Sequence, residues 1–190
     1  MRILSLLASL PLLAIAQVIL PDNAIQGMAL HVQDETGNMT YIHESEFEKY
    51  NISLVTGGGD GTNSTNSTSL ETRGSGDYMV CDTPVIDIED LRTGLILLTD
   101  QLGCDTLIQL QGGAPFKFVA LTLYYGSTVV YICNYLEALL HFTGPTLFQH
   151  VTEAFSHCGQ TNTAAWYHGA NLDLSWGYTN AANEFCGPRQ

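Results

Sequence analysis

The feature of this sequence that most constrains its fold is a pattern that occurs twice. Each copy has a helical segment that ends near a cysteine, then two strand-like segments joined by a turn, then a second cysteine. The spacing from Cys104 to Cys133 in the first copy is nearly equal to the spacing from Cys158 to Cys186 in the second. A repeated helix–strand–strand unit predicts two helices that cover an antiparallel sheet, since each apolar helix stripe needs a sheet face to bury it.

The helices and strands of both copies are predicted from residue periodicity. Residues 87–102 and 146–157 carry apolar side chains at helical spacing, and acidic residues gather in the first turn of the earlier segment, where the helix dipole favours them. The strand-like segments are rich in β-branched and aromatic residues, and they are 116–124, 128–135, 164–168 and 171–178. We therefore predict an α+β two-layer sandwich with two helices on one face of a four-stranded antiparallel sheet. Residues 77–81 are a candidate for a short fifth strand.

A further hairpin is predicted near the N-terminus. Two short β-prone segments, 28–32 and 39–43, flank a turn that contains Gly37 and Asn38, which is a common hairpin signal. A hairpin alone is marginally stable in water. We therefore expect either that it docks loosely on the main domain or that residues 17–56 belong to a detachable pro-segment.

The pairing of the cysteines is predicted from hairpin geometry. In an antiparallel hairpin the start of the first strand lies beside the end of the second, so each helix-end cysteine is placed near the cysteine of its own hairpin. This argument predicts the disulfides Cys104–Cys133 and Cys158–Cys186, with Cys81 unpaired and available for a disulfide-linked dimer. A rival arrangement joins Cys81 to Cys186.

The N-terminus is typical of a secreted protein. Residues 1–16 combine a basic start, a short apolar run and the sequence Ala14-Ile15-Ala16, which together predict a signal peptide cleaved after Ala16. The chain is then expected outside the cell, in an oxidising compartment. The apolar stretch 118–142 contains Gly126, Ser127 and Glu137, so a buried hairpin explains it better than a membrane span, and no stable membrane insertion is expected.

The middle of the chain is polar and carries glycosylation signals. Residues 57–77 consist mainly of Gly, Ser, Thr and Asn and are predicted to form a flexible tether ahead of a disulfide-stabilised core over 78–190. Sequons of the N-x-[ST] type all lie before Arg73, and they predict glycosylation at Asn38, Asn51, Asn63 and Asn66.

The charge balance restricts the partners. Asp and Glu number 19 against 6 Lys and Arg, for a formal net charge of −13. A phosphate backbone needs a basic surface, so a nucleic-acid partner is excluded, and anionic lipids are disfavoured. The expected partner is a protein or a glycan outside the cell.

Short cysteine-anchored phrases in residues 78–190 resemble a class of small cysteine-rich secreted proteins of filamentous fungi. The phrases are Val129–Tyr135, His157-Cys158-Gly159, Trp176-Gly177-Tyr178 and Glu184-Phe185-Cys186. The resemblance implies a host-directed effector or an antimicrobial toxin, and the helix–strand–strand pattern is similar to the two-layer fold of the killer toxins of smut fungi. The segment Leu70–Arg73 also resembles a kexin-type processing site, which implies cleavage after Arg73 and release of residues 17–73.

The sequence contains no recognisable catalytic motif, and no metal or cofactor site is expected. His150 and His157 share a helix face but lie about 10 Å apart along it, too far for one zinc ion. Four aromatic residues form either a ligand-binding groove or part of the packed core, and they are Trp166, Tyr167, Trp176 and Tyr178. The sequence thus favours a non-enzymatic effector- or toxin-like binding protein. A cell-wall or glycan-binding module and a hydrolase with an unrecognised site are the alternatives.

Overall fold

A computed structural model describes residues 18–50, 52–56, 78–103, 106–110, 116–134, 140–159, 162–168 and 174–186. The N-terminal part contains β1 (Gly27–Asp34), β2 (Met39–His43), the 3-10 helices η1 (Glu44–Glu46) and η2 (Glu48–Tyr50), and β3 (Ile52–Thr56). The first copy of the repeat spans β4 (Tyr78–Val85), α1 (Ile88–Leu102), β5 (Thr106–Leu110), β6 (Phe116–Tyr125) and β7 (Thr128–Asn134). The second spans β8 (Leu140–Phe142), α2 (Gly144–Cys158), β9 (Asn162–His168) and β10 (Leu174–Asn180).

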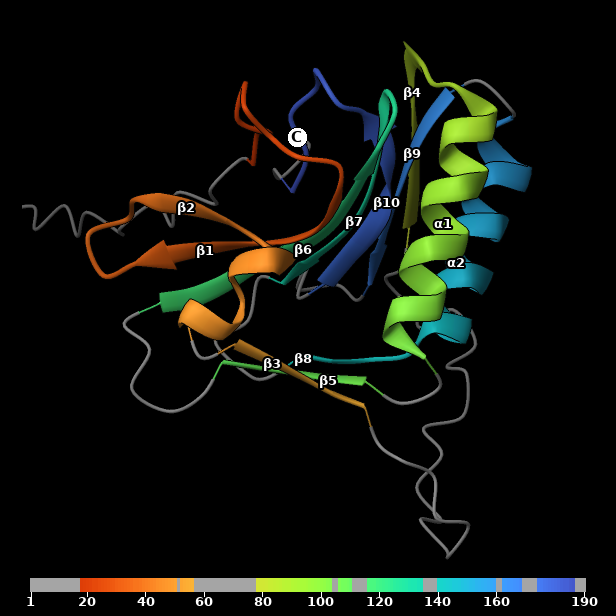
Figure 1. Ribbon diagram of the computed structural model, residues 1–190. Coiled ribbons are helices and arrows are strands. Elements are labelled where there is room, and N and C mark those ends of the chain that lie inside the picture. Colours follow the sequence, from red (N-terminus) through yellow and green to blue (C-terminus); the bar gives the residue numbers. More distant parts are fainter. Residues whose placement is uncertain are drawn as a thin grey trace, which may run out of the picture.

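The main sheet is antiparallel throughout and has seven strands in the order β2-β1-β6-β7-β10-β9-β4 (Figure 1). The four predicted strands form its centre, so the α+β class and the antiparallel pairing are confirmed, but the prediction of a four-stranded sheet was wrong. The candidate fifth strand is β4, which pairs with β9 at one edge.

The N-terminal hairpin is an integral part of this sheet. β1 pairs with β6 from Gly27 opposite Tyr124 to Asp34 opposite Phe116, with one irregularity after His31. The prediction of a loosely attached hairpin was therefore wrong. The physical reason is that β6 would otherwise be an open edge of apolar residues, and β1 supplies the backbone and side-chain partners that this edge needs.

The two helices lie side by side on one face of the sheet (Figure 1). The carboxylate of Asp87 caps α1 by accepting hydrogen bonds from the backbone N–H groups of Glu89 and Asp90. Thr143 caps α2 in the same manner through the N–H of Thr146. α1 covers β6 and β7, whereas α2 covers β9 and β10, so each helix lies over the hairpin of its own copy.

A smaller sheet of three strands, in the order β3-β5-β8, was not predicted. β3 pairs with β5 from Ile52 opposite Leu110 to Thr56 opposite Thr106, and β5 pairs with β8 over three positions. These strands are short and come from distant parts of the chain. No local pattern in the sequence could reveal that they meet.

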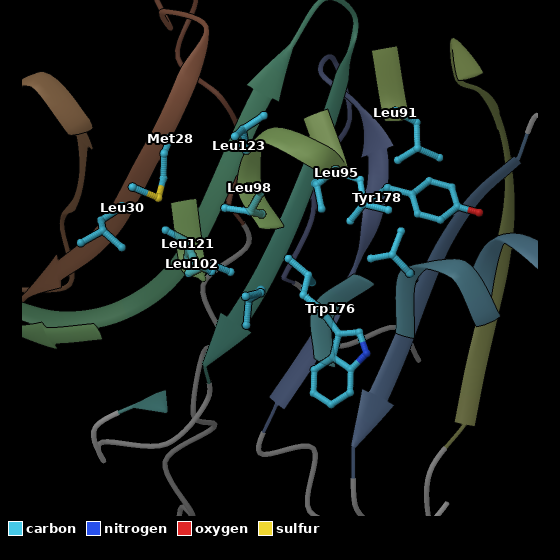
Figure 2. Packing of buried hydrophobic residues seen from close by; sticks show 14 of the residues in the cluster. Met28, Leu30, Leu91, Leu95, Leu98, Leu102, Leu121, Leu123, Trp176 and Tyr178 are labelled. Carbon is cyan, nitrogen blue, oxygen red and sulfur yellow. The ribbon is translucent and has the colours of Figure 1, made fainter. Parts of the chain in front are cut away.

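The core has one layer on each face of the main sheet. The helix-side layer joins α1 and α2 to alternate residues of the strands (Figure 2), and its labelled members are Met28, Leu30, Leu91, Leu95, Leu98, Leu102, Leu121, Leu123, Trp176 and Tyr178. On the opposite face Val18, Leu20, Phe185 and Cys186 cover Tyr131 and Cys133. Val18 and Phe185 exchange two backbone hydrogen bonds of 2.8 and 2.9 Å, so the described ends of the chain hold each other against the sheet.

Candidate functional site

The disulfides are Cys81–Cys158 and Cys133–Cys186. The predicted pairs Cys104–Cys133 and Cys158–Cys186 were wrong, as was the rival Cys81–Cys186. Because Cys81 is bonded within the chain, a dimer linked through it is not available. Cys104 lies outside the described residues.

The alternation of side chains along β7 explains why the predicted cysteine pairs were wrong. Val130 and Ile132 face the helices, whereas Val129, Tyr131 and Cys133 face the other side, as the alternation of a strand requires. Cys133 thus cannot reach a cysteine at a helix end. It meets Cys186, which follows β10 and returns across the far face. The end of α2 lies instead beside the edge strand β4, where Cys158 meets Cys81.

The aromatic pair on β10 does not line an open groove. Trp176 is 4% exposed and Tyr178 0% exposed, both beneath the helices. The ring of His150 packs over Trp176 with centroids 4.6 Å apart. The core-packing interpretation therefore holds for these two residues. In β9, Trp166 and Tyr167 occupy the register positions opposite Trp176 and Ser175, and their side chains lie outside the described part of the structure.

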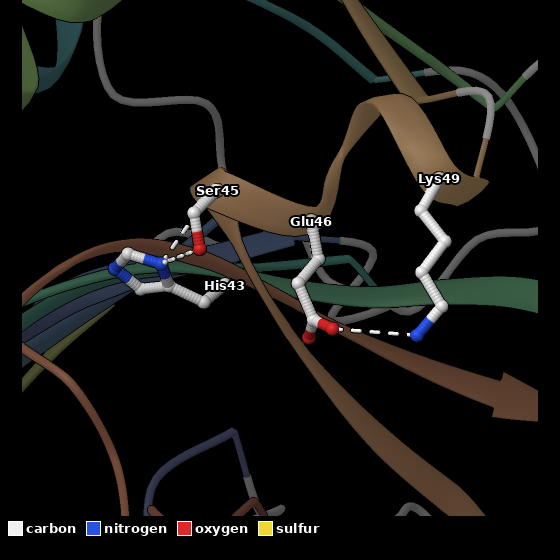
Figure 3. Close-up of polar contacts among 4 residues, drawn as sticks. All are labelled: His43, Ser45, Glu46 and Lys49. Carbon is white, nitrogen blue, oxygen red and sulfur yellow. Dashed lines mark hydrogen bonds and ion pairs between the residues drawn. The ribbon is translucent and has the colours of Figure 1, made fainter.

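A serine and a histidine lie close together where β2 leads into η1 (Figure 3). The Oγ atom of Ser45 is 2.8 Å from Nδ1 of His43, and the backbone N–H of Ser45 donates to the same nitrogen over 3.2 Å. On the other side of the ring, Nε2 lies 3.2 Å from the carbonyl oxygen of Gln26. A serine nucleophile needs a base and also free N–H donors for an oxyanion. Here the N–H of Ser45 is used by His43, so the arrangement is that of a helix cap.

η1 and the last turn of α1 both carry acidic residues. Glu44 accepts a hydrogen bond of 2.9 Å from the side chain of Gln101. Asp100, the neighbour of Gln101, is exposed in the last turn of α1, a turn that holds no basic residue. Glu46 is partly neutralised by Lys49 at 3.3 Å (Figure 3). This end of the molecule is therefore suited to a cationic ligand.

His31 is a buried titratable residue that no pattern in the sequence distinguishes from the other histidines. It is 2% exposed on the far face of the sheet, and its Nε2 lies 3.2 Å from Oγ1 of Thr122. Tyr41 and Phe185 pack edge-on against its ring at 5.3 and 5.7 Å. Burial lowers the pKa of His31 to about 4, because the charged ring would lose its water. The side chain is therefore neutral at physiological pH.

One predicted glycosylation residue lies among the described residues. Asn38 is exposed in the β1–β2 turn, and its Nδ2 donates to Oγ1 of Thr36 over 2.7 Å and to Asp34 over 3.3 Å. Hydrogen bonds, first from the Thr36 hydroxyl and then from the backbone of Asn38, lower the pKa of Asp34. The remaining predicted sites of modification or processing lie outside the described residues, and they are Ala16, Asn51, Asn63, Asn66 and Arg73.

Comparisons with protein-family models, with curated proteins and with solved structures find no match. The resemblance to secreted fungal proteins therefore stays a prediction. Among the described residues, no group of three or more His, Cys, Asp and Glu side chains is arranged to hold a metal ion. No helix in the described ranges is both long and apolar enough to cross a membrane.

Proposed function

We propose that this protein is secreted and acts outside the cell as a non-enzymatic, effector- or toxin-like protein that binds a molecule of a host or competitor. The observation that carries the proposal is the pair of disulfides within one chain, Cys81–Cys158 and Cys133–Cys186. Such bonds persist in oxidising compartments. They agree with the leader-like residues 1–16.

Binding, rather than another extracellular role, is supported by rigidity and charge. One disulfide fixes the edge strand β4 to α2, and the other fixes the C-terminal segment to β7. The full chain that contains this scaffold has a formal charge of −13. A rigid, strongly charged surface attracts partners of opposite sign and loses little entropy when they bind. The expected partner is therefore basic.

A binding assay on whole cells tests the proposal. The full chain is produced with its own leader in a eukaryotic secretory host, labelled, and added to intact cells of candidate hosts and competing microorganisms. We expect saturable binding that the unlabelled protein displaces. Beads of chitin and glucan serve as the control for the glycan-binding alternative, and no retention on them is expected because Trp176 and Tyr178 are buried.

A separate substitution tests the alternative that the protein is a hydrolase. Ser45→Ala removes the hydroxyl group beside His43 and is expected to leave cell binding unchanged. Release of products from mixed peptide or glycan substrates by the unaltered protein, abolished by Ser45→Ala, would contradict the proposal. Retention on the glycan beads that accounts for all cell binding would also contradict it.

A further inference from the structure

We propose that the outer surface of the two helices, near the end of α1, is the docking site for a cationic, apolar-rich segment of a partner protein. This surface, here called the helix patch, consists of Ile96, Leu97 and Asp100 on α1 and Phe148 on α2. The inference rests on the proposed binding function and names the chemistry of the partner and the place where it binds.

The structure brings the two helices together at this point. The N–H of Gly144 at the start of α2 donates to the carbonyl oxygen of Gly103 over 2.8 Å. A Cβ atom at Gly144 would collide with the carbonyl oxygen of Thr99, so this approach depends on glycine. From this contact the helices run in opposite directions (Figure 1). Phe148 lies one turn, about 5 Å, beyond Gly144, and Ile96 lies one turn before Thr99, so the two side chains are at the same level.

The apolar members of the patch are unusually exposed. Ile96 is 47% exposed, Leu97 41% and Phe148 46%. They are not needed to hold the helices on the sheet, since Leu91, Leu95, Leu98 and Leu102 already fill that face of α1. Single exposed apolar residues are common, but grouped ones often mark a site of contact with another molecule.

The charge around the patch decides what kind of molecule fits. Asp100 lies one turn from Ile96, in the last turn of α1, where the helix dipole disfavours a negative charge. Glu44 accepts a hydrogen bond from Gln101, the residue that follows Asp100. Arg92, one turn before Ile96, is paired with Glu89 at 3.0 Å. A cation on the partner would therefore find a carboxylate and the carbonyl end of a helix beside an apolar strip.

The same charge argues against a second copy of the chain as the occupant. Each copy has a formal charge of −13, so two copies repel, and a helix patch facing its own equivalent would bring carboxylates together. A segment with Lys or Arg beside Leu or Phe satisfies both parts of the patch. An amphipathic basic helix is the simplest example.

A peptide-binding experiment on the full secreted chain tests the inference. The probe is a synthetic, fluorescent amphipathic helix of about 18 residues built from Leu and Lys. A Leu/Glu peptide of the same pattern and a Lys/Ser peptide of the same charge are the matched probes. Anisotropy is measured at about 50 mM and about 500 mM salt, since screening weakens charge pairing. We expect the Leu/Lys peptide to bind, and the other two to bind at least about tenfold more weakly.

Variants then locate the site. The double variant Ile96→Gln/Phe148→Gln is expected to weaken Leu/Lys binding by about tenfold or more, and Asp100→Asn to weaken it a fewfold with less salt dependence. Ile25→Gln and Asp22→Asn are the matched controls, because both residues are exposed on the N-terminal segment, and neither should change binding. Circular dichroism and thermal midpoints verify that every variant folds.

Three results would overturn the inference. The first is unchanged Leu/Lys binding by the folded double variant, and the second is equal binding of the Leu/Glu peptide. The third is a dimer of the unaltered chain, seen by sedimentation, that the double variant disperses. Saturable cell binding that survives in the double variant would reject the helix patch while leaving the proposed function standing. Failure of the unaltered protein to bind cells would reject the function itself.

Discussion

His31 is a basic side chain held where its charged form is poorly stabilised. It is 2% exposed among Thr122, Tyr41 and Phe185, and burial lowers its pKa from 6.5 to about 4. Below pH 6.5 the His31 ring therefore binds a proton in the unfolded chain but stays neutral in the folded chain. Stability that is complete above this pH is lost as the pH falls toward 4.

We predict that this one residue makes the fold sensitive to acid. The loss between pH 6.5 and pH 4 is expected to be about 3 kcal/mol, measured as the free energy of unfolding in urea at several pH values. The control is His31→Gln, which keeps an N–H donor for Thr122 and does not titrate. The other titratable groups change the stability of both proteins equally. The test is therefore the difference between the two curves of unfolding free energy against pH. Parallel curves over this range would contradict the role given to His31.

At the scale of elements, α1 is fastened to the β6–β7 hairpin by a carboxylate. Asp90 accepts hydrogen bonds of 2.7 Å from the backbone N–H of Ser127 and 2.9 Å from its hydroxyl group. Gly126 in the same turn has a φ of +57°, and a Cβ there would collide with the carboxylate of Asp90. The turn therefore depends on glycine for both its backbone conformation and its close approach to the helix.

We predict that Gly126→Ala destabilises the protein by more than the strain of a positive φ alone, because the new Cβ also collides with Asp90. Gly37 in the β1–β2 turn is the control, since its φ is +92° and the only atom near its missing Cβ is Nε2 of Gln33, 3.9 Å away. Gly37→Ala should cost about 1 kcal/mol, and Gly126→Ala roughly 2 kcal/mol or more. Thermal or chemical unfolding measures both. Equal costs would show that the contact with Asp90 contributes nothing.

The elements also show what local sequence could and could not predict. Both helices were found from their apolar spacing, and the two repeated hairpins from their β-branched residues and turns. β3, β5 and β8 were missed because each is short and pairs only with distant segments. The disulfides were paired wrongly because the pairing depends on which face Cys133 points to and on which strand lies beside the end of α2. The helix patch was missed because it requires two helices to be placed side by side.

At the scale of the whole molecule, the N-terminal part cannot be treated as a removable pro-segment. β1 pairs with β6 along its length, and Met28, Leu30 and Val32 are at most 3% exposed. Removing residues 17–73 would uncover the apolar side chains of β6 and also take away Val18, which holds Phe185. Cleavage after Arg73 stays a prediction, but release of the cleaved part is opposed by the sheet.

We therefore predict that a chain cut after Arg73 remains one particle. Native mass spectrometry or gel filtration of the cut protein should find both pieces together at neutral pH. Because all five cysteines follow Arg73, no disulfide joins the pieces, and denaturant without reductant should separate them. Release of the N-terminal piece under native conditions would contradict the seven-stranded sheet.

The two disulfides support both the fold and the proposed secretion of the protein. They close sequence separations of 77 and 53 residues, and each is expected to contribute about 4 kcal/mol. The most direct test is non-reducing peptide mapping of the protein collected from the medium of a secretory host, with free thiols blocked before digestion. We expect peptides that join Cys81 to Cys158 and Cys133 to Cys186, with the blocking label on Cys104. Recovery of Cys104 linked to Cys133, or of Cys158 linked to Cys186, would contradict this pairing.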